Sequence, residues 1–423
     1  MEEKGVLENI ISVTEKVLSG LPSLGRKDVS KQLQSFSQII KQFPEQKKFS
    51  KNDSETLHKI FTAIARPEIA KQFLSEVDTE NFYAFGKHLI KHLSKQSEQI
   101  RKITHEYLNL FRFPCFLRRI YDQSQQVDGL AGEQKWEKLI HDLILKSNYH
   151  TGVLFNQRLR DYKNKTLFKV IRGNSVTEYS WEKSAKLIKN YQQSFHELLR
   201  KEISDSHGRV AFLLENCLEM ALLDLACLTG GIVNVMIPAN SVTEHIRFML
   251  IQCKANLIVV HNEKLLSKIK SIKNDLPDLK HAVLLEGNSI EEWVISFSEF
   301  MKLKSENSAE FEIDMQSLAT IMYTSGTTGE PKGIMFSQMN IIYKRFCRAM
   351  AIPEIGEEDR FLAFLPLYHT FGRYLEMTGS VFWAAEYCFL ENPSVETMIT
   401  NMQLVKPSVF ISIPKKWMQL MIM

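Results

Sequence analysis

The sequence predicts an α/β fold in which a helical N-terminal region, residues 1–148, precedes an α/β domain, residues 149–423. Three observations lead to this prediction. Up to about residue 148, apolar residues recur three and four positions apart, which is the period of an α-helix. From residue 149 on, short apolar runs alternate with helical segments, the pattern of a mostly parallel, doubly wound sheet. A loop rich in Gly, Ser and Thr then interrupts two apolar runs between Ile321 and Phe336.

Composition places the chain among ordinary globular proteins. Of 423 residues, 44% are hydrophobic, and the net charge of +4 is too small to indicate nucleic-acid binding. The six cysteines form no C-x-x-C pair, so we expect reduced core cysteines, not a zinc site or disulfides. The acidic start and the lack of a long uncharged apolar stretch predict a soluble, cytoplasmic protein.

One segment of the helical region, Lys87–Arg119, carries eight basic residues and ends among three phenylalanines. Such a segment suits peripheral contact with an anionic membrane or docking of a protein partner. The competing interpretation, which we favour, is a solvated helix face packed on its own bundle. His88 and His92 lie four apart, as metal ligands do, but no third ligand accompanies them, so we predict surface histidines.

The α/β domain is expected to open with a β-hairpin that turns at Gly173. Ser180 is predicted to cap the helix that follows the hairpin, with Lys183 in place of the usual capping-box acid. Further strands are predicted at 208–216, 232–237, 256–260, 281–285, 361–367 and 408–413. Helices are predicted at 217–229, 242–253, from 263, at 379–385 and at 415–422. Ligands of such sheets bind at the carboxyl ends of the strands.

The loop that follows Tyr323 reads TSGTTGEPKG and has the composition of a phosphate-binding loop. Gly326 and Gly329 lack a Cβ, so the backbone N–H groups can approach an anion. Hydroxyl donors come from four residues: Thr324, Ser325, Thr327 and Thr328. Lys332 adds a mobile positive charge. The competing interpretation is an ordinary Ser/Thr/Gly-rich hairpin turn, and the spacing excludes a Walker A loop.

This loop resembles the phosphate-loop signature of the adenylate-forming enzymes, which include acyl-CoA synthetases, luciferases and peptide-synthetase adenylation domains. Four other stretches resemble the same family: HGRVAFLLENCLE from His207, ACLTGGIVNVMIPAN from Ala226, LPLYHTFG from Leu365, and PSVFISIPKKW from Pro407. The last is similar to a stretch of the long-chain acyl-CoA synthetases. The resemblance covers residues 150–423 and implies part of the large adenylate-forming domain.

The resemblance implies an ATP- and Mg²⁺-dependent activation of a carboxylic acid, a long-chain fatty acid in this branch, to acyl-adenylate and then to acyl-CoA. ATP, fatty acid and CoA are the implied partners. Thr324–Gly329 and Lys332 would hold the ATP phosphates, and Thr328 would also lie near Mg²⁺. His369, in the LPLYHTFG stretch, would lie near the acyl carboxylate; the competing interpretation is a locally satisfied loop histidine.

Some family elements are missing. After the loop, Ser337-Gln338-Met339-Asn340 lacks the histidine found in many members, and no counterpart follows for the family's ribose-binding or C-terminal elements. We therefore expect a truncated domain that binds ATP weakly without completing acyl transfer. Two alternatives stay open: a non-catalytic protein that binds a nucleotide, a partner or a membrane, and a ligase that passes the acyl group to a carrier protein.

Overall fold

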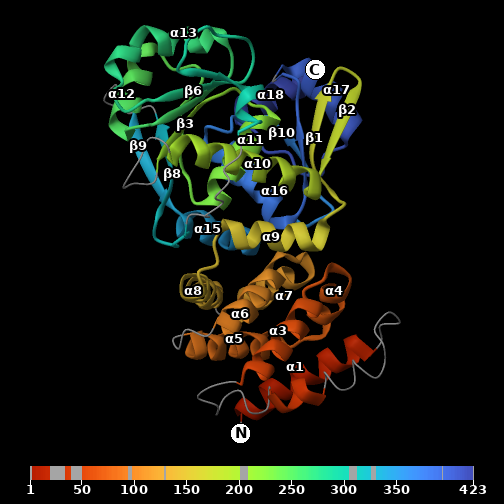
Figure 1. Cartoon of the computed structure of the whole chain (residues 1–423). Coiled ribbons are helices and arrows are strands. Elements are labelled where there is room, and N and C mark those ends of the chain that lie inside the picture. Colours follow the sequence, from red (N-terminus) through yellow and green to blue (C-terminus); the bar gives the residue numbers. More distant parts are fainter. Residues whose placement is uncertain are drawn as a thin grey trace. The chain divides into compact units, whose positions relative to one another are not determined.

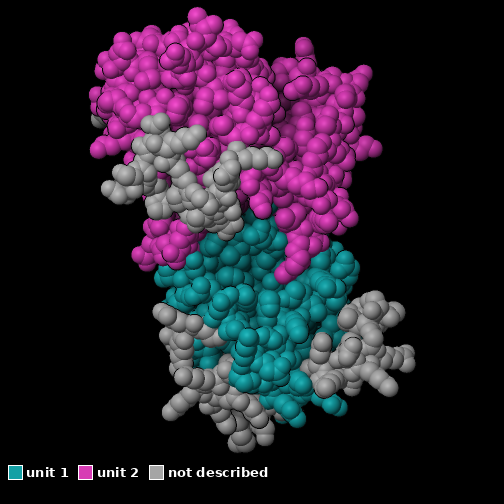
Figure 2. Space-filling model, in the orientation of Figure 1, with its two compact units in different colours: residues 1–157, 342–357 teal, residues 158–341, 358–423 magenta. Residues whose placement is uncertain are grey.

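The computed structural model describes residues 2–19, 34–39, 50–93, 98–127, 130–200, 208–303, 312–324, 330–392 and 394–422. The chain forms two compact units, coloured separately in Figure 2. Unit 1 comprises residues 1–157 and 342–357, and unit 2 comprises residues 158–341 and 358–423. The predicted domain boundary at residue 148 lies near the first of these divisions, but it stays a prediction.

Unit 1 is helical, as the apolar periodicity predicts (Figure 1). Its elements are α1 (Glu2–Ser19), α3 (Lys51–Ile64), α4 (Pro67–Glu76), α5 (Thr79–Leu93), α6 (Glu98–Asn109), η1 (Leu110–Arg112), α7 (Pro114–Val127) and α8 (Leu130–Ser147). Helix α9 (Thr151–Tyr162) and helix α15 (Gln338–Ala351) each belong partly to this unit. Pro67 and Pro114 begin helices, where a missing N–H costs nothing.

The aromatic end of the basic segment lies in the core of unit 1. Phe111, Phe113 and Phe116 are completely buried, and the Phe116 ring lies 4.9 Å from that of Phe82. These rings are therefore not available to a membrane, and the structure supports the interpretation of a basic face packed on its own bundle. His88 and His92 are buried too, so the prediction of surface histidines is wrong. Both lie on the apolar face of α5, which packs inward.

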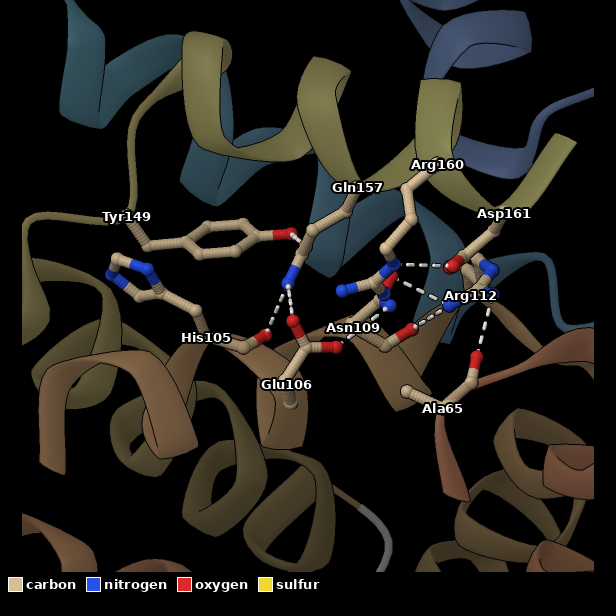
Figure 3. A network of polar contacts seen from close by, with 9 residues as sticks. All are labelled: Ala65, His105, Glu106, Asn109, Arg112, Tyr149, Gln157, Arg160 and Asp161. Atoms are coloured by element: carbon tan, nitrogen blue, oxygen red, sulfur yellow. Dashed lines mark hydrogen bonds and ion pairs between the residues drawn. The ribbon is translucent and has the colours of Figure 1, made fainter. Parts of the chain in front are cut away.

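A buried polar network crosses unit 1 (Figure 3). The Gln157 amide donates to the His105 carbonyl oxygen at 2.9 Å and to Glu106 at 3.3 Å, and accepts from Tyr149 at 2.7 Å. Nearby, the Arg112 guanidinium donates to the backbone oxygens of Asn109, at 2.6 Å, and of Ala65, at 3.0 Å. Buried polar groups are costly unless paired, and this pairing allows Arg112 to be fully buried.

Unit 2 contains two sheets. The strands are β1 (Thr166–Arg172), β2 (Ser175–Ser180), β3 (Arg209–Leu213), β4 (Val233–Met236), β5 (Leu257–Val260), β6 (His281–Leu284), β7 (Val294–Ser296), β8 (Leu318–Thr324), β9 (Lys332–Ser337), β10 (Arg360–Ala363) and β11 (Glu386–Phe389). The larger sheet has the order β7-β6-β5-β3-β4-β8-β9 and is parallel except for β9. The smaller has the order β10-β11-β1-β2, with β2 antiparallel.

Helices cover both faces of the larger sheet, as a doubly wound fold requires (Figure 1). The helices and turns of unit 2 are α10 (Trp181–Arg200), α11 (Leu218–Gly230), α12 (Thr243–Cys253), α13 (Glu263–Ile272), η2 (Lys273–Asp275), α14 (Phe297–Phe300), η3 (Phe371–Met377), α16 (Thr378–Trp383), α17 (Val395–Val405) and α18 (Pro414–Ile422). Ala211 and Leu213 of β3 face α12 and α13, whereas Phe212 points to the other side, toward Phe195 of α10.

The predicted helix cap at Ser180 is confirmed. Ser180 accepts a hydrogen bond from the Lys183 N–H at 3.2 Å and so caps α10. Gly231 ends α11 in the left-handed conformation, with φ of 71°, which glycine adopts without strain. The strand predicted at 408–413 is wrong, because in that stretch only Val409 forms a bridge, to Phe361 of β10. The strand predicted to end at Leu367 ends at Ala363. The smaller sheet was also not predicted as a separate layer.

Candidate functional site

The glycine-rich loop joins two antiparallel strands, as predicted. Thr324, the last residue of β8, lies opposite Lys332, the first residue of β9, and both are exposed. Ser325, Gly326, Thr327, Thr328 and Gly329 lie outside the described residues. The two described ends of the loop thus bring one hydroxyl and one ammonium group to the same end of the hairpin.

The base of the hairpin is held in place by Tyr323. Its hydroxyl donates to Gln252 at 2.8 Å, and the Met249 carbonyl oxygen lies 3.2 Å away, so β8 is fixed to the end of α12. Burial raises the pKa of Tyr323, which keeps the phenol protonated as a donor. Across the hairpin, a Cβ on Gly333 would lie 3.2 Å from the Tyr323 ring, tighter than most carbon contacts. Glycine therefore suits this position next to the loop.

The second predicted site residue, His369, follows β10 in a tightly folded segment, residues 364–371, which we call the His369 segment. Asn216, just beyond β3, holds this segment at two points. Its amide donates to the Leu365 carbonyl oxygen at 2.8 Å and accepts from the Leu367 N–H at 2.8 Å. A Cβ on Gly372 would lie 2.4 Å from the Pro366 carbonyl oxygen, so only glycine lets the chain close here.

The His369 ring is exposed at the end of this segment. The Phe371 N–H donates to its Nδ1 at 3.4 Å, and the two rings lie 5.6 Å apart. An Nδ1 that accepts a hydrogen bond favours the tautomer with the proton on Nε2. Nε2 can then donate to a ligand such as a carboxylate, which is the role that the sequence predicts for this residue.

A pocket of about 770 Å³ opens at the carboxyl ends of strands of both sheets in unit 2. Glu215 and Asn216 follow β3, Asn240 follows β4 and Asn262 follows β5, while Phe364 follows β10. This agrees with the rule that ligands of open α/β sheets bind at this edge.

The charged side chains that line the pocket are Lys264, Lys268, Lys416, Glu215 and Glu391. Lysines thus outnumber carboxylates, which favours an anionic ligand. Tyr368 also lines the pocket, and burial raises the pKa of its phenol, so the hydroxyl stays neutral. Thr324, Lys332 and His369 are not among the lining residues. No sequence pattern predicts these lysines as a group, because they come from α13 and α18, which are about 150 residues apart in the chain and line one pocket only after folding.

Among the described residues, no cluster of three or more His, Cys, Asp or Glu side chains forms a metal site. In the same part of the chain, no helix combines the length and apolarity needed to cross a bilayer. All six cysteines are free thiols; Cys227, Cys253 and Cys388 are buried, whereas Cys115, Cys217 and Cys347 are partly exposed. Burial raises the pKa of the thiols of Cys217 and Cys388, which keeps them protonated.

Comparison with known proteins gives the family. Residues 194–422, more than half of the chain, match the model of the AMP-binding enzymes. The chain belongs to the AMP-binding enzyme family. Long-chain-fatty-acid–CoA ligase ACSBG1 of Rattus norvegicus is 30% identical over 204 residues, which cover 45% of this chain and 28% of that protein. The human ligase ACSBG2 is 25% identical over 265 residues, covering 60% of this chain and 38% of that protein. The chain thus spans about a third of the length of these relatives.

Solved structures support the fold. The anthranilate CoA ligase AuaEII, in complex with anthranoyl-AMP, superposes with a TM-score of 0.56 at 20% identity, covering 64% of this chain and 50% of that chain. A long-chain-fatty-acid–CoA ligase from Archaeoglobus fulgidus gives a TM-score of 0.55 at 18% identity, with coverage of 64% and 53%. The predicted fold class and family resemblance are confirmed.

Proposed function

We propose that unit 2 carries the nucleotide- and carboxylate-binding part of an AMP-forming acyl-CoA synthetase that acts on a long-chain fatty acid. Two features of a chain of this family carry the proposal together. One is the β8–β9 hairpin that bears Lys332, and the other is the exposed His369 on a segment anchored by Asn216. Long-chain-fatty-acid ligases among the relatives support the choice of substrate.

In the proposed reaction, an oxygen of the fatty carboxylate attacks the α-phosphorus of ATP, and the bond from that phosphorus to the β-phosphate oxygen breaks. Acyl-adenylate and pyrophosphate result. Lys332 and the loop hydroxyls would stabilise the negative charge on the departing pyrophosphate, and Mg²⁺ would neutralise part of the same charge. The Nε2–H of His369 would orient the carboxylate by a hydrogen bond.

In the second step, the CoA thiol adds to the acyl carbonyl carbon and AMP departs. CoA is strongly anionic through its phosphates, so the pocket with Lys264, Lys268 and Lys416 is our candidate for its phosphate-bearing part. Ammonium groups bind phosphates as compact point charges. A carrier protein that bears the same pantetheine thiol is the alternative acceptor.

The test is calorimetric titration of the purified 423-residue chain with MgATP. Wild-type protein should bind, and Lys332→Ala should weaken binding by roughly tenfold or more, because a hydrogen bond to a charged oxygen is worth about 1.5–3 kcal/mol. Lys302→Ala, an exposed lysine just after α14, is the matched control and should bind as wild type does. A folded wild-type chain that binds no MgATP at millimolar concentration would refute the proposal.

The acceptor is tested separately with Lys264→Ala combined with Lys268→Ala. This pair should weaken CoA binding while leaving MgATP binding unchanged, since neither lysine belongs to the hairpin. Equal CoA affinity in the folded variant would remove CoA from the pocket and favour the carrier-protein acceptor.

A further inference from the structure

A buried polar cluster that the proposed chemistry does not use connects β8, the strand before the glycine-rich loop, with η3, the helix after the His369 segment. Its members are Arg373 of η3, Asp224 of α11, Asn234 of β4 and Thr320 of β8. All four side chains are essentially inaccessible to solvent. A cluster of this kind is expensive to bury, and it joins four separate elements of unit 2.

Arg373 is the centre of the cluster. Its Nε donates to Asp224 Oδ2 at 2.8 Å and its Nη2 to Asp224 Oδ1 at 2.5 Å, a bidentate pair. Nη2 also lies 3.0 Å from Asn234 Oδ1, and Asn234 in turn donates to Asp224 at 2.7 Å. The remaining nitrogen, Nη1, donates to the Thr320 hydroxyl at 2.8 Å.

The position of Arg373 along the chain links it to the carboxylate side of the candidate site. Its backbone N–H donates to the His369 carbonyl oxygen at 3.0 Å, so Arg373 stands one helical turn after His369. Gly372, between them, has no room for a side chain. The residue whose side chain is fixed in the cluster is thus bonded through its backbone to His369, which limits how far the His369 segment can move.

Thr320 links the same guanidinium to the phosphate side. It lies on β8, four residues before Thr324, and pairs with Asn234 of β4 in the sheet. Strand β8 leads directly into the glycine-rich loop. The guanidinium is planar and rigid, so its contacts to β8, to β4 and to α11 hold in one fixed geometry.

We propose that Arg373 is a positioning residue that couples the strand carrying the phosphate loop to the His369 segment, so that ATP binding and fatty-carboxylate binding reinforce each other. This inference rests on the proposed function. In this proposal the buried pair of Arg373 and Asp224 sets the distance between the two ligand-binding segments and contacts neither ligand.

The test removes only the contact to β8. Thr320→Val deletes the hydroxyl that accepts from Arg373, keeps the shape of the side chain and suits a strand. Thr320→Ser restores the hydroxyl. The matched control is Thr378→Val, the same change at a buried threonine of α16 whose hydroxyl donates to the Tyr374 carbonyl oxygen.

The quantity measured is the ratio of the MgATP dissociation constants without and with saturating hexadecanoate. We expect Thr320→Val to lower this ratio at least about fivefold, the low end of measured coupling between sites. Thr320→Ser and Thr378→Val should keep the wild-type ratio. Hydrogen exchange without ligands gives a second readout: Thr320→Val should speed exchange in residues 365–377, on a different element from the substitution.

The outcomes separate the two proposals. If the folded wild type binds no MgATP, the proposed function fails and the coupling falls with it. If the wild type binds both ligands cooperatively but Thr320→Val keeps the ratio and the exchange rates of residues 365–377, the cluster is structural only and the inference is overturned. If Thr320→Val lowers the ratio of dissociation constants and Thr320→Ser lowers it equally, the inference is overturned as well.

Discussion

Acid is expected to destabilise unit 1 through two histidines, His105 and His150. Burial lowers the pKa of His105 from 6.5 to about 4, and the nearby positive charges of Arg101, His58 and Lys102 lower it further. A hydrogen bond to the Ser147 carbonyl oxygen, 2.8 Å from Nε2, opposes this shift. Burial likewise lowers the pKa of His150 to about 4, and His105 adds to that shift. Both rings are therefore neutral in the folded protein at pH 7.

The sign of the effect follows from proton binding. In the unfolded chain these histidines regain a pKa near 6.5, so between about pH 6.5 and pH 4 the unfolded state binds more protons. Their contribution is fully present above pH 6.5 and is lost as the pH falls toward 4. At pH 5 the loss is about 2 kcal/mol for one such histidine.

The assay is urea unfolding between pH 7.5 and 5, with hydrogen exchange of α6 and α8 reporting on unit 1. His105→Gln removes one titrating group and leaves an amide that can donate to Ser147, so it should flatten the pH dependence by about one proton. The control, His245→Gln, lies on α12 of unit 2 and should leave exchange in α6 and α8 unaltered at every pH. A His105→Gln variant with the full wild-type pH dependence would refute the reasoning.

Two shorter predictions concern packing. Gly372→Ala should lower the melting temperature of unit 2 markedly, since overpacking costs about 1–3 kcal/mol and the new methyl would meet backbone oxygens. The comparison is Gly173→Ala, where no atom lies within 4 Å of the new methyl and only the backbone strain at φ of 55° opposes it. Gly173→Ala should therefore cost less, and an equal loss in both would argue against the steric reason. Anionic vesicles should not bind the chain even at low salt, because Phe111, Phe113 and Phe116 are buried; binding that weakens with added salt would restore the membrane interpretation of the basic segment.

Local patterns predicted much of the fold. The strands from Arg209 to Leu284 and the helices between them appear within about three residues of the predicted bounds. Their apolar periods and their flanking glycines and asparagines are local signals. The stretch after Pro407 misled the prediction. Its apolar residues suit a strand, but strand formation needs a partner edge, and within residues 408–413 only Val409 has one.

The candidate site was predictable only where it lies in one continuous stretch. The hairpin of Thr324 and Lys332 and the segment of His369 are each continuous in sequence, so composition was sufficient to single them out, and their ligand-binding roles stay predictions. Asn216 supports His369 from about 150 residues away, and the lysines of the pocket come from α13 and α18. No period or spacing connects such residues, because their proximity is created by the order of the strands in the sheets.

The buried ion pair of Arg373 and Asp224 is not explained by a gain in stability alone. Desolvation lowers the pKa of Arg373, but the carboxylate of Asp224 more than reverses that effect and leaves it raised. Replacing such a pair by apolar residues is often neutral or stabilises a protein by about 1–4 kcal/mol. Stability is therefore a weak reason to place an arginine here. A fixed geometry between η3 and β8 is a stronger one, since apolar side chains can repack and slide, whereas a bidentate pair with a third contact to Thr320 allows one arrangement.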